Sequence, residues 1–321
     1  MKRFLMLAAT AIALFGCSDD SDDNSDCGVN NDEIRVSAYL ADVKPANSRT
    51  AIDGSTGTAS WVANDAIGLF SSEARLTASN VNFTASGTST LAWATSTPIY
   101  WADASTMHKF LAYSPYASGN TSTATVKLPA LTPQTGTITS AQDFLISRNL
   151  GTTGVARTSD GSINLVFTHA FSLIQFQVTI NSSIASGTTL KSCALTGGAS
   201  DKLITSDGNS TIDLSTGAIT TSGTTANTIT ATPSSAPTLS STVVNFFIVV
   251  LPGTYAPTVQ FALTEGGATV TVPTASIAST AYAAGNKYTY TVNISRTAIS
   301  ISNPTITDWT NNSSGSISGG I

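Results

Sequence analysis

The side chains that could carry out acid–base or metal chemistry are few and widely spaced along this sequence. Two histidines, His108 and His169, stand in contexts that favour a structural role in a turn or in the core. Glutamates are scarce, and Asp65, Asp103 and Asp143 each stand where a structural role explains them better. Hydrolysis of a glycoside needs two carboxylates that flank one bond, and no spacing of His, Cys and Asp matches a metal site. The sequence also lacks a nucleophile elbow, a P-loop and a dinucleotide fingerprint. We therefore expect no catalytic activity, no cofactor and no bound metal.

The N-terminus has the pattern of an export signal that ends at a reactive thiol. A basic start precedes the apolar residues 4–15, and Gly16 places a small residue directly before Cys17. The apolar run is too short to cross a bilayer core, which needs about 20 residues. The stretch "LFGC" resembles the lipobox of bacterial lipoproteins, which implies that residues 1–16 are a signal peptide and that Cys17 is acylated. An ordinary signal peptide is the alternative.

An acidic segment follows this cysteine. Five aspartates lie between positions 19 and 26, in a chain of which 10% of the residues are charged. We expect residues 17–33 to form a solvated tether between a lipid anchor in the outer membrane and the folded part of the chain. An acidic run after an acylated cysteine also resembles the surface-export signal of Bacteroidetes lipoproteins. A spacer without any signal is the alternative.

Charge and cysteine content limit the kinds of partner. The 14 basic residues are scattered and the formal net charge is -5, so no basic stripe could neutralise the phosphates of a nucleic acid. Acylation of Cys17 would leave two cysteines, Cys27 and Cys193. We expect Cys193 to be free and partly buried, and a Cys27–Cys193 disulfide is the alternative in an oxidising envelope.

Short runs of Val, Ile, Thr, Phe and Tyr, separated by Gly, Asn, Ser and Pro, predict an all-β protein. The expected strands include residues 34–40, 163–167, 171–180, 243–251 and 288–294. Within the first of them one face carries Ile34, Val36, Ala38 and Leu40. The segment 243–251 is apolar nearly throughout, which is typical of a central strand covered on both faces.

The length of the chain suits two domains after removal of the leader. A polar, Gly-containing stretch at 157–162 is the best boundary between them. We therefore expect an N-terminal β-sandwich over 34–160 and a C-terminal β-sandwich over 161–321.

Six short signatures occur in a fixed order along the chain. They are "SRTAIDGSTGTASWVANDAIGLF" (48–70), "KFLAYSPYA" (109–117), "AQDFLIS" (141–147), "VFTHAFSLIQFQVTI" (166–180), "AYAAGNKYTYTVNI" (281–294) and "ITDWTNNSSGSISGGI" (306–321). Behind a lipobox, they resemble the fimbrillin family, the lipoprotein pilins of gut and oral Bacteroidetes. The resemblance runs from Cys17 to the C-terminus and so covers nearly the whole chain.

The resemblance implies two transthyretin-like β-sandwiches and a precursor that an Arg-specific protease cuts. The cut removes the anchor and the first strand, and a strand from a neighbouring subunit fills the vacated groove. Cleavage between Arg49 and Thr50 is expected, with Lys44 and Arg35 as competing sites. The displaced strand carries Ile34, Val36, Ala38 and Leu40, and we expect it to be central or near-central in its sheet.

The C-terminal stretch is the expected donor, with side chains that could fill pockets at Ile299, Ile301, Ile306, Ile317 and Ile321. The expected function is that of a structural pilin of a cell-surface fimbria that serves adhesion, with other pilin subunits and a host or bacterial surface ligand as partners. The Gly-rich ending leaves open a tip or accessory adhesin that does not polymerise. A monomeric lipoprotein that binds glycans through Trp61, Trp93 and Trp101 is the other alternative, although such tryptophans more often lie in the core.

Overall fold

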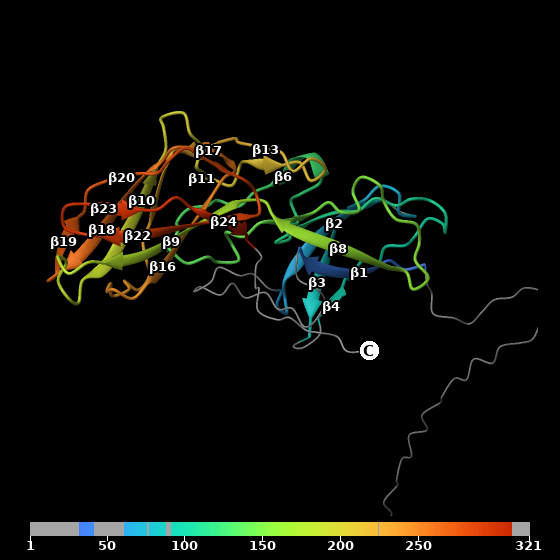
Figure 1. The fold of residues 1–321 in the computed structure, drawn as a ribbon. Coiled ribbons are helices and arrows are strands. Elements are labelled where there is room, and N and C mark those ends of the chain that lie inside the picture. The colour runs from blue at the N-terminus through green and yellow to red at the C-terminus, as the bar shows by residue number, and fades with distance from the viewer. Residues whose placement is uncertain (1–31, 42–60, 76, 88–90, 224, 310–321) are drawn as a thin grey trace, which may run out of the picture. The chain divides into compact units, whose positions relative to one another are not determined.

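The computed structural model describes residues 32–41, 61–75, 77–87, 91–223 and 225–309. Apart from the single 3-10 turn η1 (Thr123–Thr125), their regular structure consists of β-strands (Figure 1). This confirms the all-β prediction. No helix among the described residues is long and apolar enough to span a membrane.

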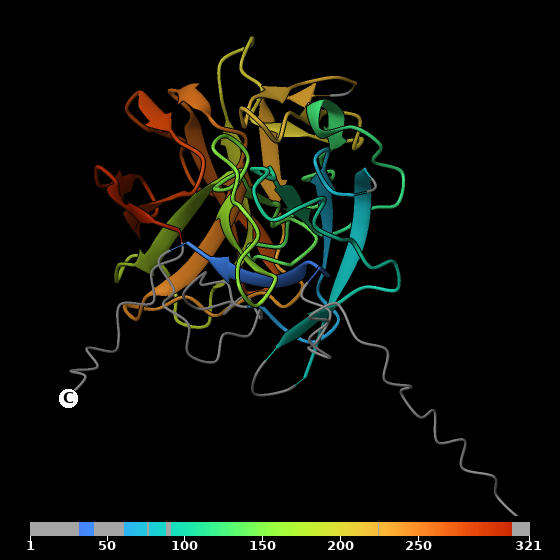
Figure 2. The same cartoon turned by 90° about the vertical axis from the view of Figure 1, so that its right-hand side faces the viewer.

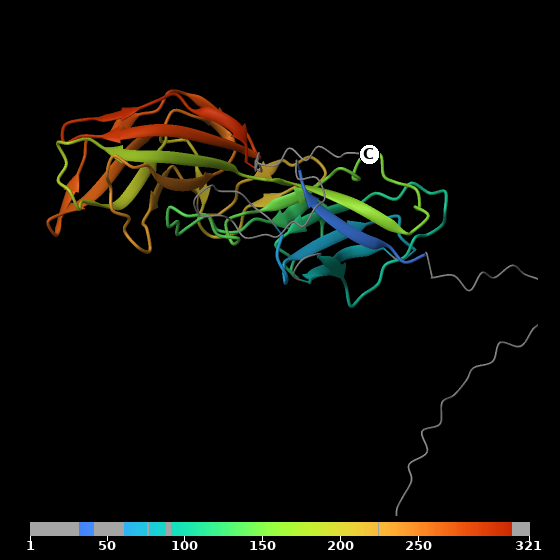
Figure 3. The ribbon, with the colours of Figure 1, turned by 60° about the horizontal axis from the view of Figure 1, so that its bottom comes forward.

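The strand that was expected to be displaced belongs to a seven-stranded sheet. In spatial order its strands are β1 (Arg35–Leu40), β8 (Ser162–His169), β7 (Leu145–Ser147), β5 (Leu111–Ser114), β2 (Ala66–Ser71), β3 (Ala78–Ser86) and β4 (Ala92–Ala94). β1 runs parallel to β8, and the other neighbours are antiparallel. The blue β1 and the yellow-green β8 lie side by side in Figures 1 and 3, and in Figure 2 β1 crosses the front of the view.

β1 stands at the edge of this sheet, not at or near its centre as expected from the sequence. Its hydrogen-bonded neighbour along the strand is β8 alone, although β4 approaches it from the opposite edge of the sheet. The period of two along β1 shows that one face is buried but does not show how many neighbours the backbone has. This is why the position in the sheet could not be inferred from the pattern.

Two five-stranded sheets lie further along the chain. One has the order β16 (Val244–Val250), β9 (Ser172–Ile180), β22 (Asn286–Ile294) and β23 (Ile299–Ile301), with β24 (Thr305–Asp308) also paired to β22. The other has the order β15 (Thr228–Ala231), β10 (Thr189–Thr196), β18 (Thr258–Glu265) and β19 (Ala268–Thr271), with β20 (Ala275–Ser276) also paired to β18.

Three smaller pairings complete the strand list. β17 (Gly253–Tyr255) pairs with β21 (Thr280–Tyr282), and β11 (Ile204–Thr205) with β14 (Thr225–Ala226). The third group has the order β13 (Ile219–Thr220), β12 (Thr211–Ile212) and β6 (Val126–Lys127). The predicted strands 163–167, 171–180 and 288–294 correspond to β8, β9 and β22 and are confirmed.

The apolar segment that was predicted to be a central strand, β16, lies at the edge of its sheet. It is nevertheless covered on both faces, because residues 246–250 are all buried. The side chain of Gln134 occupies its open edge: the amide donates to the Val249 carbonyl at 2.8 Å and accepts from the Val249 N–H at 2.9 Å. Gly136, at a φ of +74°, accepts the Phe247 N–H at 2.8 Å. These contacts satisfy backbone groups that a neighbouring strand would otherwise pair.

Two separate apolar clusters fill the interior. The smaller one is formed by residues of the seven-stranded sheet and of segments beside it, and it contains, among others, Ile34, Leu40, Trp61, Ile67, Trp101, Phe110, Leu165 and Phe167. The larger one extends along the chain as far as Trp309. β8, which follows the predicted boundary at 160/161, pairs with β1 and β7 and contributes to the smaller cluster. The described residues group as one compact unit, so the division into 34–160 and 161–321 stays a prediction.

Candidate assembly groove

One row of apolar side chains fixes β1 to the core. Ile34, Val36, Ala38 and Leu40 are all buried, with 2%, 7%, 9% and 1% of their surfaces exposed. Arg35, between the first two, is exposed. Strand alternation therefore places the predicted pocket-filling face inward and the charged residue outward. Removal of β1 would expose the part of the smaller apolar cluster that these four side chains cover.

The backbone of β1 is held by a parallel ladder with β8 that runs from Arg35 opposite Ser162 to Leu40 opposite Phe167. The ladder continues past both ends of the strand, since the Arg35 N–H donates to the Gly161 carbonyl at 3.0 Å and the Ala41 N–H donates to the Phe167 carbonyl at 2.7 Å. Without β1, the facing N–H and C=O groups of β8 would be unpaired, which is a template for another extended chain.

The start of β1 has a second neighbour. The Ile34 N–H donates to the Ile99 carbonyl at 2.8 Å, and the Trp101 N–H donates to the Asp32 carbonyl at 2.8 Å. These bonds flank an antiparallel bridge between Glu33 and Tyr100. Residues 32 and 33, which were expected to belong to the tether 17–33, are thus hydrogen-bonded to the described fold through an isolated bridge. The polar sequence gave no sign of this pairing, because the partner segment is far away along the chain.

Two arginines hold the side chain of Asp32 just before β1. Arg75 Nη2 donates to Asp32 Oδ2 at 3.2 Å, and Arg157 Nη1 donates to Asp32 Oδ1. The Arg75 guanidinium also lies 5.6 Å from the centre of the Tyr100 ring. Neither the aspartate nor its arginines were singled out from the sequence as a site.

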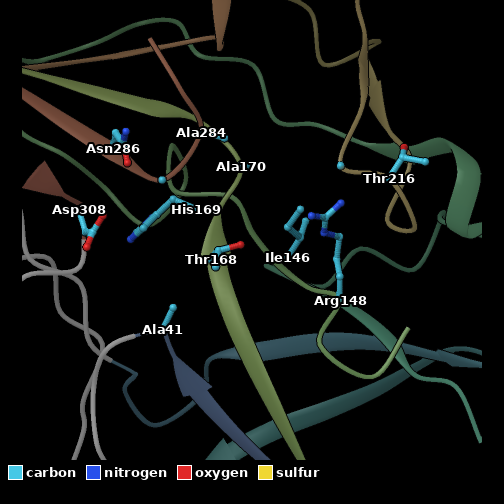
Figure 4. A pocket seen from close by; sticks show the side chains of 12 residues that line it. Ala41, Ile146, Arg148, Thr168, His169, Ala170, Thr216, Ala284, Asn286 and Asp308 are labelled. Atoms are coloured by element: carbon cyan, nitrogen blue, oxygen red, sulfur yellow. The ribbon is translucent and has the colours of Figure 1, made fainter. Parts of the chain in front are cut away.

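A cavity of about 400 Å³ opens where β1 ends (Figure 4). Its lining comes from distant parts of the chain and includes Ala41, Arg148, His169, Thr216, Asn286 and Asp308. Ala41 is the last described residue before position 61, and Asp308 comes directly before Trp309, the last described residue. Residues near two breaks in the described chain therefore line the same cavity.

Both histidines have partners within the fold, in keeping with the structural role that the sequence favours. His108 Nε2 accepts the Ala102 N–H at 3.0 Å and its Nδ1 lies 2.8 Å from the Thr106 carbonyl. His169 Nδ1 lies 2.5 Å from Asp143 Oδ1, and the ring stacks on Trp309 with 4.0 Å between the ring centres. Both histidines are buried. No group of three or more His, Cys, Asp or Glu in the described segments could hold a metal ion.

The aspartates also have structural partners. Asp103 accepts hydrogen bonds from Ser105 and from the backbone and side chain of Thr106, which hold its pKa well below the usual range. Asp65 accepts the Val62 N–H at 2.7 Å and faces a second cavity, of about 490 Å³, that Asp143 also lines. Burial raises the pKa of Asp65 to about 6.

The tryptophans and the cysteine lie in the interior. Trp61 and Trp101 are buried, which confirms the core interpretation, and Trp93 is half-buried with its ring centre 5.1 Å from that of Trp61. Cys193 is a free thiol that is fully buried and not partly buried as expected, and burial raises its pKa well above the usual range. Cys27 lies outside the described residues.

The expected donor residues fall in different places. Ile299 and Ile301 lie in β23 and pack half-buried against the larger cluster, whereas Ile306 in β24 is 53% exposed. Trp309 closes this stretch: it is fully buried, and its N–H donates to the Gly285 carbonyl at 2.7 Å. Cys17, Lys44, Arg49, Thr50, Ile317 and Ile321 lie outside the described residues.

A comparison of the sequence with known protein families identifies the family to which it belongs. The pattern of fimbrillin-like proteins matches residues 49–309. The chain belongs to the fimbrillin-like family. Family membership implies a place in cell-surface fimbriae and association with other fimbrial subunits, and such proteins are structural adhesion proteins and typically not enzymes. A search of the curated proteins found no match.

Three solved structures share the fold of this fimbrillin-like chain, and each is described as a candidate cell adhesion protein. The one from Bacteroides uniformis has 21% identity and a TM-score of 0.52, and the match covers 84% of this chain and 99% of that one. The one from Bacteroides ovatus has 15% identity and a TM-score of 0.55, and the match covers 86% of this chain and 97% of that one. The one from Bacteroides fragilis has 17% identity and a TM-score of 0.50, and the match covers 88% of this chain and 100% of that one.

Proposed function

We propose that this fimbrillin-like chain is a structural subunit of a cell-surface fimbria that serves adhesion and is assembled by strand exchange. The precursor is exported as a lipoprotein acylated on Cys17 and anchored in the outer membrane. An Arg-specific protease cuts between Arg49 and Thr50, β1 leaves, and a strand of another subunit takes its place. The C-terminal residues that include Ile317 and Ile321 supply a donor strand, and two transthyretin-like sandwiches form the body.

The observation that supports this proposal most directly is the way in which β1 is held. Its side chains complete the smaller apolar cluster, yet along most of its length its backbone pairs with β8 alone. A cut after Arg49 would make β1 part of a separate peptide that only these contacts retain. Its large buried side chains, Ile34, Val36 and Leu40, stabilise it by roughly 5–9 kcal/mol in total. Exchange for a similar strand has a small net free energy, so release of β1 should limit the rate.

Limited digestion of the full chain with an Arg-specific protease tests the proposal. We expect a new N-terminus at Thr50, followed by oligomer ladders on a denaturant-free gel, because the open groove becomes available only after the cut. Arg49→Ala should stay monomeric, whereas Lys44→Ala, which removes a competing site of cleavage, should behave as wild type. Ladders of equal intensity from Arg49→Ala would contradict the proposal.

A further inference from the structure

Charge is concentrated at one end of the β1 groove. Asp32 precedes the strand, and its carboxylate accepts hydrogen bonds from Arg75 at 3.2 Å and from Arg157. The two arginines belong to other parts of the fold, since Arg75 follows β2 and Arg157 precedes β8. When β1 leaves, the carboxylate leaves with it and both guanidinium groups stay.

Within the described part of the chain, no other carboxylate forms an ion pair with either arginine. Arg75 would keep its contact with the Tyr100 ring, which holds the guanidinium in place but supplies no negative charge. Two guanidinium groups that converge on one point repel each other unless an anion lies between them. The planar fork of arginine suits a carboxylate, because its N–H donors match the spacing of the two oxygens.

We propose that Arg75 and Arg157 form a carboxylate receptor at the entrance of the β1 groove, which selects an incoming strand that carries an acidic side chain. This inference rests on the strand exchange proposed above. Asp32 stands two residues from Ile34, the first of the side chains that alternate into the core. In a strand that runs in the direction of β1, the incoming acid must therefore stand two residues before the apolar residue that takes the place of Ile34. In a strand that runs the opposite way, it must stand two residues after that apolar residue. The groove would thus select an incoming strand by its acidic side chain as well as by its row of apolar side chains.

The receptor bears on which partner the groove takes. Residues 310–321 contain no Asp or Glu. In the preceding stretch, Asp308 does stand two residues from Ile306, but Pro304 occupies the next position of that face, and proline lacks the N–H that a ladder needs. No side chain of residues 310–321 could therefore replace the carboxylate that both arginines lose with β1. The occupant that fits is an acid-bearing strand of a different subunit.

Peptide binding to the cut protein tests the receptor. The full chain is digested at Arg49, and binding of a fluorescent peptide with residues 31–41 of this sequence is measured by anisotropy. The same peptide with Asp32→Asn removes the charge and keeps the apolar side chains. We expect the aspartate peptide to bind about 3- to 10-fold more tightly, because two partly exposed ion pairs are at stake. In Arg75→Gln/Arg157→Gln protein, or at high salt, the ratio of the two peptides' dissociation constants should fall to about one.

Two controls keep the result specific. Arg296→Gln removes an arginine that pairs with Glu265 at 2.6 Å, outside the groove, and should leave the ratio unchanged. A peptide with residues 310–321, which lacks both the acid and the row of apolar side chains, should bind more weakly than the aspartate peptide. Equal binding of all peptides to an emptied groove would overturn the receptor and leave strand exchange standing. If β1 stays bound after the cut and no peptide enters, strand exchange itself fails, and the receptor with it.

Discussion

Asp65 illustrates how packing alters a single side chain at the residue scale. Its carboxylate accepts the Val62 N–H, which favours the charged form, but burial outweighs this bond and the negative charge of Asp143 acts in the same direction as burial. The pKa therefore rises from 3.8 to about 6. The position next to a cavity does not by itself make Asp65 a catalytic acid, because hydrolysis also requires a second carboxylate placed to flank the same bond of a substrate.

Stability should respond to pH through this residue. Since the pKa of Asp65 is higher in the folded state, the folded protein holds a proton that the unfolded chain has released between pH 3.8 and about 6. Its contribution is therefore fully present below pH 3.8 and is lost as pH rises through 6. Asp65→Asn keeps an oxygen for the Val62 N–H but carries no charge. Between about pH 4 and pH 7 the wild type should lose about 1 to 2 kcal/mol relative to this variant, less than the full shift implies because the carboxylate is partly exposed.

Urea unfolding of both proteins at each pH measures this difference. Asp103→Asn is the matched control, because the pKa of Asp103 is lowered and the sign of its effect is reversed. Parallel pH profiles for the wild type and Asp65→Asn would show that the environment of Asp65 does not have the expected effect.

Gln134 is the second residue whose role only the fold reveals. Its amide pairs with both the N–H and the C=O of Val249. We expect Gln134→Ala to lower the free energy of unfolding by about 2–4 kcal/mol, because it leaves two buried backbone groups without partners. The half-buried Gln260, whose side chain bonds Thr274 at 3.2 Å in an exposed setting, provides the control, and Gln260→Ala should change stability by less than about 0.5 kcal/mol. Equal stability of the two variants in thermal or urea unfolding would contradict the bridging role.

At the scale of elements, β1 combines strong burial with sparse backbone pairing. Most strands of the seven-stranded sheet have a hydrogen-bonded neighbour on both sides, whereas β1 relies on β8 and, at its start, on residues 99–101. Such a strand is held mainly by its side chains. A replacement strand with the same alternation could therefore satisfy the same groove.

Leu40 is the side chain of β1 that is buried most completely. We expect Leu40→Ala to destabilise the uncut protein by about 2–5 kcal/mol, because it removes buried methyl groups and leaves a cavity. The same change should speed the loss of β1 after cleavage, which native mass spectrometry follows as a fall in mass. Arg35→Gln, an exposed position of the same strand, is the control and should leave both quantities near the wild-type values. Equal release rates for Leu40→Ala and wild type would contradict the idea that burial retains β1.

At the scale of the whole molecule, the fold and the family fit an extracellular structural protein. The regular structure of the described residues is made of strands, and the family pattern covers residues 49–309. Both histidines and the aspartates Asp65, Asp103 and Asp143 serve structural roles. The exits of the chain at Ala41 and after Asp308 share one cavity, although they are far apart in sequence.

Acylation of Cys17 would anchor the precursor in the outer membrane before assembly. We expect Cys17→Ser to abolish the incorporation of labelled palmitate and to leave the protein outside the outer-membrane fraction, because the hydroxyl is not a substrate for thioether formation. Cys27→Ser is the matched control and should be labelled as wild type. Undiminished labelling of Cys17→Ser in whole cells would refute the lipoprotein assignment.

The sequence by itself determined the fold class, the strands β1, β8, β9 and β22, the inward face of β1 and the structural role of both histidines. Period-two alternation and turn residues are local signals, so they can be read without knowing the neighbours. Tertiary structure alone decided that β1 and β16 are edge strands, that β8 pairs with β1, and that Asp32, Arg75 and Arg157 meet. Strand order and ion pairing depend on segments that lie up to 125 residues apart. One sequence carries no local record of such contacts, because the free energy that selects them arises only when the distant surfaces pack.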